Sequence, residues 1–139
     1  MSPTPLIIGI TEVKPKNNRY PVQEAEYQLE GYNLWQVNIE NQIGRGIIIY
    51  THKSLIAKQL ELTTKYEEAV WVKIQLQKQE NLLLGCMYRS ESGTLENNNF
   101  LNIIIKEACS LNVDHILLMG DYNYKKIDWD SWSAPGETE

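Results

Sequence analysis

The 139-residue sequence contains only two cysteines and two histidines. Cys86 and Cys109 form no C-x-x-C pair, and no histidine stands at a zinc-ligand spacing from them, so the sequence gives no indication of a zinc site. Cys86 falls in a predicted strand and Cys109 in a predicted helix. We expect both thiols to be small buried apolar groups.

Long apolar runs are also lacking. No apolar stretch approaches the roughly 18 residues that a membrane-spanning helix needs, and the amino terminus shows no charged segment followed by an apolar one. We therefore expect an intracellular protein that does not enter a membrane. The sequence does not distinguish the nucleus from the cytoplasm.

Positive charge is scarce as well. The chain has 13 Lys and Arg residues against 18 Asp and Glu residues, a net charge of −5, which is unlike a general nucleic-acid binder. A local basic rim of Lys14, Lys16, Arg19, Arg45 and Arg89 could still contact phosphates. The alternative interpretation is that these charges are simply solvated.

The most informative segment that is present is an apolar strand that runs into a polar turn. Ile116–Met119 is a continuous apolar run, which favours a strand buried on both faces. Gly120 permits a tight turn because it has no Cβ. Asp121 and Asn123 then point the same way, where they could bind a hard cation and a phosphate or water. The alternative is that Asp and Asn only form the turn.

A second carboxylate stands after another short apolar strand, Leu6–Ile10. If this strand and Ile116–Met119 are parallel in one sheet, Glu12 and Asp121 emerge at the same carboxyl edge. Together with Asn123 they would hold Mg²⁺ with several waters retained. The alternative is that Glu12 begins a helix or is solvated.

Four ordered blocks resemble a known family. They are ITE at Ile10–Glu12, GRGIIIY at Gly44–Tyr50, LLLGCMYR at Leu82–Arg89 and ILLMGDYNYKKIDW at Ile116–Trp129. This order is similar to endonuclease/exonuclease/phosphatase domains, and most similar to the endonuclease part of non-LTR retrotransposon polyproteins. The resemblance covers almost the whole chain. It implies an α/β four-layer sandwich, two mixed sheets face to face with helices outside, and Mg²⁺-dependent cleavage of DNA phosphodiesters, with Mn²⁺ as a substitute.

The resemblance also implies a role for each matching residue. Glu12 corresponds to the metal-ligating Glu, while Asp121 and Asn123 correspond to the pair that positions the attacking water and the scissile phosphate. Tyr88 corresponds to the tyrosine near the phosphate, and Arg89 adds a contact to the nucleic-acid backbone. Ser90 replaces the usual proline, so this loop is expected to be less rigid.

The chain departs from the family at both ends. The family's first strand, which carries an Asn, and its Ser-Asp-His segment have no counterpart in residues 1–139, so we expect a single partial domain with a loose tail over residues 130–139. His115 should lie about 20 Å from Asp121, at the other end of its strand. His52 follows a different strand. We therefore expect weak or no catalysis, and the alternative is an inactive retroelement fragment that at most binds a metal or a partner chain.

Hydrophobic patterns predict the remaining elements. A polar loop is expected over Lys14–Ala25, and loss of the second sheet should leave the inner face of the first uncovered, which predicts self-association or completion by another chain. A single helix is expected over Leu95–Leu111. The further predicted strands are Tyr32–Asn38, Ile47–Tyr50, Ala69–Leu76 and Leu82–Tyr88.

Overall fold

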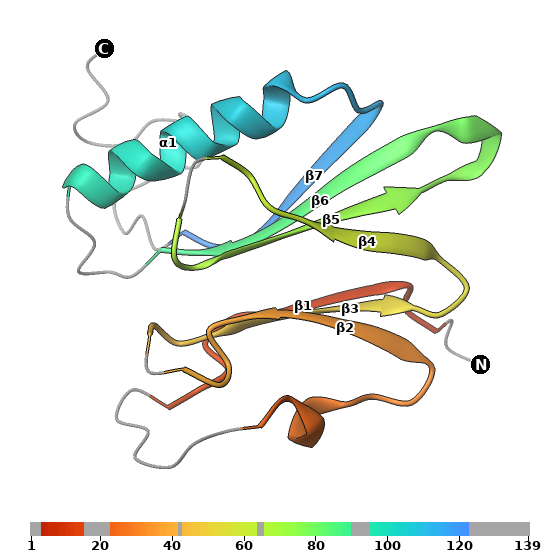
Figure 1. Cartoon of the computed structure of the whole chain (residues 1–139), viewed down its shortest axis with the longest axis horizontal. Coiled ribbons are helices and arrows are strands. Elements are labelled where there is room, and N and C mark those ends of the chain that lie inside the picture. The colour runs from red at the N-terminus through yellow and green to blue at the C-terminus, as the bar shows by residue number, and fades with distance from the viewer. Residues whose placement is uncertain (1–3, 16–22, 42, 64–65, 90–94, 123–139) are drawn as a thin grey trace, which may run out of the picture.

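The computed structural model describes residues 4–15, 23–41, 43–63, 66–89 and 95–122, and these form a mixed α/β structure with two sheets and one helix. The two sheets face each other, and the helix covers the outer side of one of them (Figure 1). No helix in the described ranges is long and apolar enough to span a membrane.

The first sheet has three strands in the order β1-β3-β2, all antiparallel. Among the described residues, its outer side carries only a short 3₁₀ turn, η1, where the expected four-layer sandwich would have a helix. The described residues therefore form three layers. The bounds are β1 Ile7–Ile10, η1 Glu24–Tyr27, β2 Tyr32–Val37 and β3 Ile47–His52.

The second sheet has four strands in the order β4-β5-β6-β7, antiparallel except for the parallel pair β6 and β7. The helix α1 forms the crossover between β6 and β7 and packs on this sheet. The bounds are β4 Ile56–Leu60, β5 Ala69–Gln75, η2 Gln77–Gln79, β6 Asn81–Tyr88, α1 Leu95–Ser110 and β7 His115–Asp121.

The predicted helix is confirmed to within one residue, and six of the strands coincide with predicted ones. The strand β4 was not predicted. Its sequence IAKQL carries Lys58 and Gln59, and its side chains are mostly exposed, so it lacks the apolar alternation of a half-buried strand. Cys86 is buried as expected, whereas the expectation for Cys109 was wrong, because its side chain faces solvent on α1.

The main core lies between the two sheets. It brings together buried side chains of β3, β5 and β6 with partly buried ones of β1, β2 and β7. The expectation of an uncovered inner face was therefore wrong, because the three-stranded sheet covers it. A second core lies between the four-stranded sheet and α1, and the helix residues that contribute buried side chains to it are Leu101, Ile104 and Ala108.

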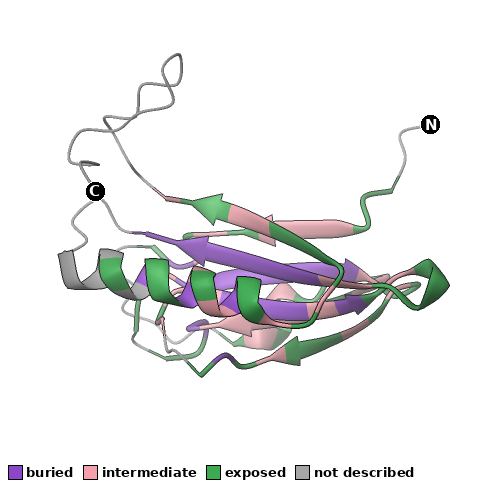
Figure 2. Ribbon diagram, turned by 90° about the horizontal axis from the view of Figure 1, so that it is seen from above, coloured by how far each residue is buried: buried purple, intermediate pink, exposed green. Residues whose placement is uncertain are grey.

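The strands β1 and β7 do not share a sheet, which corrects the expectation of one parallel sheet. They do lie against each other at one side of the sandwich, each at the edge of its own sheet (Figure 2). The edge position explains why the apolar run in β7 is not buried on both faces as predicted. Ile116 is 37% exposed and Leu117 is 46% exposed.

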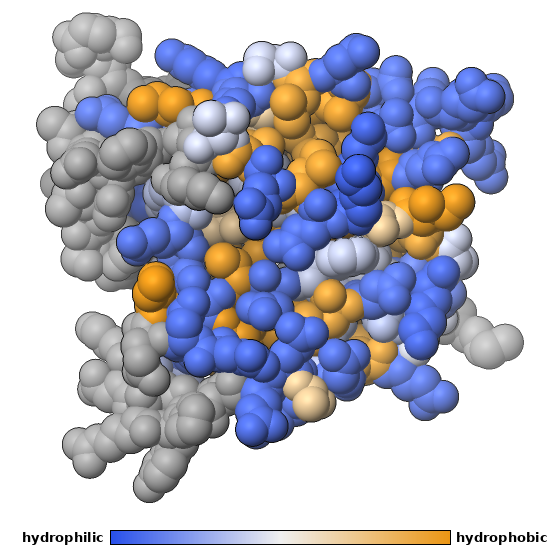
Figure 3. Space-filling model, viewed as in Figure 1, coloured by the Kyte–Doolittle hydropathy of each residue, from blue (hydrophilic) through white to orange (hydrophobic). Residues whose placement is uncertain are grey.

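The edge strands β2 and β4 form the opposite side of the sandwich. Lys58 on β4 is a charged edge residue of the kind that discourages pairing with another chain. In the view of Figure 3, hydrophilic residues cover most of the described surface, and smaller hydrophobic patches lie between them.

Candidate functional site

Three of the predicted site residues meet at one end of the sandwich. Tyr88 is the last residue of β6 and Asp121 is the last residue of β7, and the two are partners in the parallel register. Glu12 follows β1 in the other sheet, and its side chain hydrogen-bonds to Tyr88. Glu12 and Asp121 thus emerge at the same end, as expected, but they do so across two sheets rather than within one.

The predicted tight turn at Gly120 was wrong, because Gly120 lies within β7 and pairs with Met87 of β6. Gly120 has φ +142°, and a Cβ there would lie 1.9 Å from the carbonyl oxygen of Met87. The close approach to β6 therefore requires glycine. The amide of Arg89 donates to the Asp121 carbonyl at 2.8 Å, which continues the β6 and β7 pairing up to the site.

The Tyr88 hydroxyl is held in its protonated form. Its hydrogen bond to Glu12, its burial and the negative charges of Glu12 and Asp121 raise the pKa of Tyr88 to about 12, although the Arg45 charge opposes this. The tyrosine therefore acts as a hydrogen-bond donor and not as a base near neutral pH.

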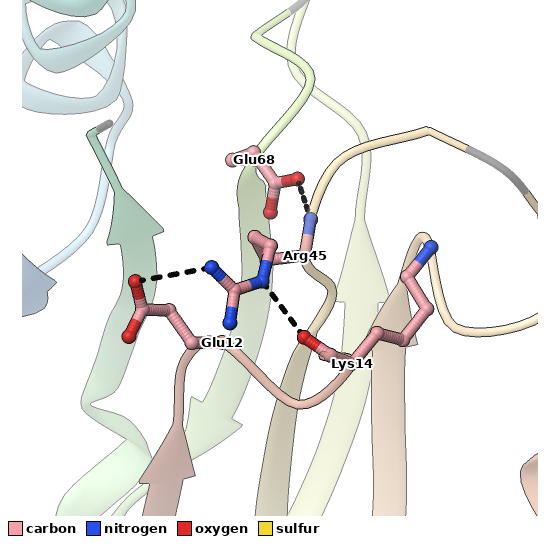
Figure 4. A network of polar contacts seen from close by, with 4 residues as sticks. All are labelled: Glu12, Lys14, Arg45 and Glu68. Atoms are coloured by element: carbon pink, nitrogen blue, oxygen red, sulfur yellow. Dashed lines mark hydrogen bonds and ion pairs between the residues drawn. The ribbon is translucent and has the colours of Figure 1, made fainter. Parts of the chain in front are cut away.

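Arg45 is the cation that faces Glu12. Its Nη1 lies 3.7 Å from Glu12 Oε1, and its Nε donates to the Lys14 carbonyl oxygen at 2.7 Å (Figure 4). The sequence placed Arg45 only in a general basic rim. Its position between Gly44 and Gly46 was the available signal, because glycines on both sides permit a close backbone approach.

Glu68 holds the backbone on both sides of Arg45. Its Oε1 accepts the Arg45 amide at 2.7 Å, and the Gly46 amide also bonds to this carboxylate. Burial raises the pKa of Glu68, while these amides and the nearby Lys14 charge lower it. Gly44 has φ +57°, and a Cβ there would lie 1.3 Å from Glu68 Oε1. Nothing in the sequence indicated Glu68.

Lys14 is a buried structural residue and not part of an exposed rim, which corrects the sequence expectation. Only 4% of it is exposed, and its Nζ donates to the carbonyl oxygens of Asn41 and Ile43 at 2.8 and 2.9 Å. Burial lowers the pKa of Lys14, and the charge of Glu68 opposes that shift. The ammonium group therefore fixes the loop before Arg45.

Arg89 is also mostly buried, at 9% exposure. Its Nη1 donates to the Tyr122 carbonyl at 3.3 Å, so one of its contacts ties together the ends of β6 and β7. Its predicted contact to nucleic acid stays a prediction. Asn123, Ser90, Lys16, Arg19 and the predicted tail at 130–139 lie outside the described residues.

Both histidines lie away from this end, as was predicted for His115. His115 begins β7 at the far end of the strand, and its Nε2 lies 2.9 Å from Glu80 Oε2. His52 ends β3, and its Nδ1 lies 2.8 Å from the Ser54 hydroxyl. Neither imidazole is placed to exchange protons with a group between Glu12 and Asp121.

No protein-family model matches this chain, and a search of curated proteins finds no match either. The site is therefore judged on its own donors. No group of three or more His, Cys, Asp or Glu side chains in the described ranges is arranged to hold a metal ion. Glu12 and Asp121 are both exposed carboxylates near Tyr88. Mg²⁺ is commonly bound by one or two carboxylates together with substrate phosphates and water. Glu12 and Asp121 supply two carboxylates of this kind, and the described residues form no closed cage of protein ligands.

Proposed function

We propose that this chain is an endonuclease/exonuclease/phosphatase-type domain, of the kind found in non-LTR retrotransposon polyproteins, and that it cleaves DNA phosphodiesters with Mg²⁺ or Mn²⁺. The observation that carries the proposal is the meeting of Glu12, Tyr88 and Asp121 at one end of the sandwich. These residues come from three separate sequence blocks and from both sheets. The two face-to-face sheets support the four-layer sandwich as part of the same proposal.

In this proposal Glu12 and Asp121 hold the metal ion through their carboxylates. A bound Mg²⁺ would neutralise charge on the scissile phosphate and the leaving oxygen. Tyr88, protonated because its pKa is raised to about 12, donates a hydrogen bond at the same place. Asn123 orients the attacking water or the phosphate, and Arg89 contacts the nucleic-acid backbone.

The proposed substrate is DNA, and the proposed location is the cell interior. Cys86 and Cys109 are both free thiols, as is usual for intracellular proteins. The net charge of −5 means that affinity for DNA has to come from local contacts at the site and not from a general positive surface.

The second candidate function is an inactive retroelement fragment that retains metal or partner binding. Its supporting observation is the position of the two histidines, which lie away from the site among the described residues. A missing general acid or base usually lowers the rate by about 10² to 10⁴. The two candidates therefore differ in turnover and not in metal binding.

A nicking assay on supercoiled plasmid separates the two candidates. The expected result for the enzyme is Mg²⁺-dependent conversion to open circles, with a loss of at least about 10² in rate for Glu12→Ala and for Asp121→Ala. Glu30→Ala is the matched control, because Glu30 is an exposed carboxylate before β2. It should leave the rate unchanged.

Two outcomes would count against the enzyme. No nicking at any protein concentration would reject it for this chain, and titration with Mn²⁺ would then test for the inactive fragment. Nicking that survives both Glu12→Ala and Asp121→Ala would show that the activity comes from another site or another protein.

A further inference from the structure

The carboxylate proposed to bind the metal is already paired with a cation of the same chain. Arg45 Nη1 lies 3.7 Å from Glu12 Oε1, and the two side chains are 28% and 41% exposed. A divalent ion at Glu12 would therefore approach a guanidinium group at short range. In the structure without a ligand, Arg45 reduces the negative charge that would attract the metal.

The position of Arg45 is fixed by contacts that do not involve Glu12. Its backbone amide donates to Glu68 and its Nε donates to the Lys14 carbonyl, both at 2.7 Å. Lys14 in turn is anchored by its buried ammonium group. Figure 4 shows the guanidinium held between these groups, with Nη1 directed at Glu12. The Arg45 side chain is thus held in place before any ligand binds, and only its terminal Nη atoms remain to bind an incoming anion.

A phosphodiester is the anion that best suits the guanidinium group of Arg45. Guanidinium groups bind phosphate oxygens through two parallel hydrogen bonds, and such charge-assisted bonds are stronger than a contact at 3.7 Å to a half-exposed carboxylate. When Arg45 bonds to a phosphate, the charge of Glu12 becomes available to a metal ion. Metal and phosphate would then favour each other's binding.

We propose that Arg45 couples the two ligands of the site: it opposes metal binding at Glu12 when the site is empty and binds the phosphate when DNA arrives. This inference rests on the proposed function, because it assumes that Glu12 binds a metal. The coupling is reciprocal, so DNA raises the metal affinity by the same factor by which metal raises the DNA affinity.

The test compares the intact protein with Arg45→Gln, which removes the cation and keeps a polar side chain. Calorimetric titration with Mn²⁺ alone should show about twofold to fivefold tighter binding for Arg45→Gln, the change in affinity that corresponds to loss of one partly exposed charge interaction. Fluorescence anisotropy with a phosphorothioate DNA duplex should show weaker DNA binding. It should also show a smaller rise in DNA affinity on adding Mn²⁺.

Two further variants make the result specific. Lys58→Gln on the exposed edge strand β4 makes the same change in net charge away from the site, and it should leave both affinities unchanged. Arg45→Lys retains the charge but cannot form the paired hydrogen bonds. It should bind Mn²⁺ like the unaltered protein and bind DNA more weakly, and it provides the test if Arg45→Gln does not fold.

The outcomes separate this inference from the function on which it rests. Mn²⁺ binding that disappears in Glu12→Gln but is unchanged or weaker in Arg45→Gln would overturn the role of Arg45 and leave the metal site standing. Absence of Mn²⁺ binding to the unaltered protein, with and without the duplex, would overturn both.

Discussion

The contact between Gly44 and Glu68 allows a sharp test of the structure, because one methyl group should displace the carboxylate that holds Arg45. In Gly44→Ala the new Cβ would lie 1.3 Å from Glu68 Oε1. The residue also has φ +57°, a left-handed conformation that costs a non-glycine residue about 1–2 kcal/mol. Displacing the carboxylate loses hydrogen bonds from backbone amides to a charged group, worth about 1.5–3 kcal/mol.

The free energy of unfolding of Gly44→Ala should therefore fall by about 2.5–5 kcal/mol, the sum of the conformational cost and the lost hydrogen bonds. Gly31→Ala is the matched control. Gly31 also has a positive φ, +88°, but a Cβ there would meet nothing within 4 Å. It should lose only the conformational part, about 1–2 kcal/mol. Urea denaturation followed by circular dichroism measures both values.

A double-mutant cycle then measures the interaction energy between Gly44→Ala and the Glu68 carboxylate. In a Glu68→Ala background the clash is absent, so adding Gly44→Ala should cost only about 1–2 kcal/mol, and the interaction energy should be about 2 kcal/mol. Equal losses for Gly44→Ala and Gly31→Ala, or additivity in the cycle, would refute the close packing of Glu68 on the Gly44 turn.

Two further predictions concern the site and the sheet edges. The pKa of Tyr88 is raised to about 12, so its stabilising contribution is complete below pH 10 and is lost as the pH rises towards 12. Burial raises the pKa of Tyr50 as well. Ultraviolet titration should therefore show one fewer late-ionising tyrosine in Tyr88→Phe, and one that ionises earlier in Glu12→Gln. The apolar edges β1 and β7 should promote self-association, with Leu6, Ile10, Ile116 and Leu117 each at least 37% exposed. Light scattering should show that Leu117→Lys reduces association and Ile56→Lys on β4 does not; a monomer at all concentrations would contradict this.

The sequence predicted individual elements well where the hydrophobic pattern was strong. The helix α1 and the strands β3, β5 and β6 are apolar at the expected spacing, and the structure places them close to the predicted bounds. The strand β4 escaped prediction because an exposed edge strand has little apolar pattern to detect. The strand β7 was identified but its burial was misjudged, because a continuous apolar run does not reveal whether a strand is central or at an edge.

The sequence by itself determined the candidate residues of the site: Glu12 and Asp121 follow predicted apolar strands, and Tyr88 was named through the family resemblance alone. Only the tertiary structure decided how they meet. Glu12 reaches Tyr88 across two packed sheets, a relation that depends on which strands pair and not on local pattern. The same holds for Arg45, Glu68 and Lys14, whose contacts join segments 23 to 31 residues apart. Local propensity cannot encode such contacts, because they form only when buried apolar surfaces fix the sheets against each other.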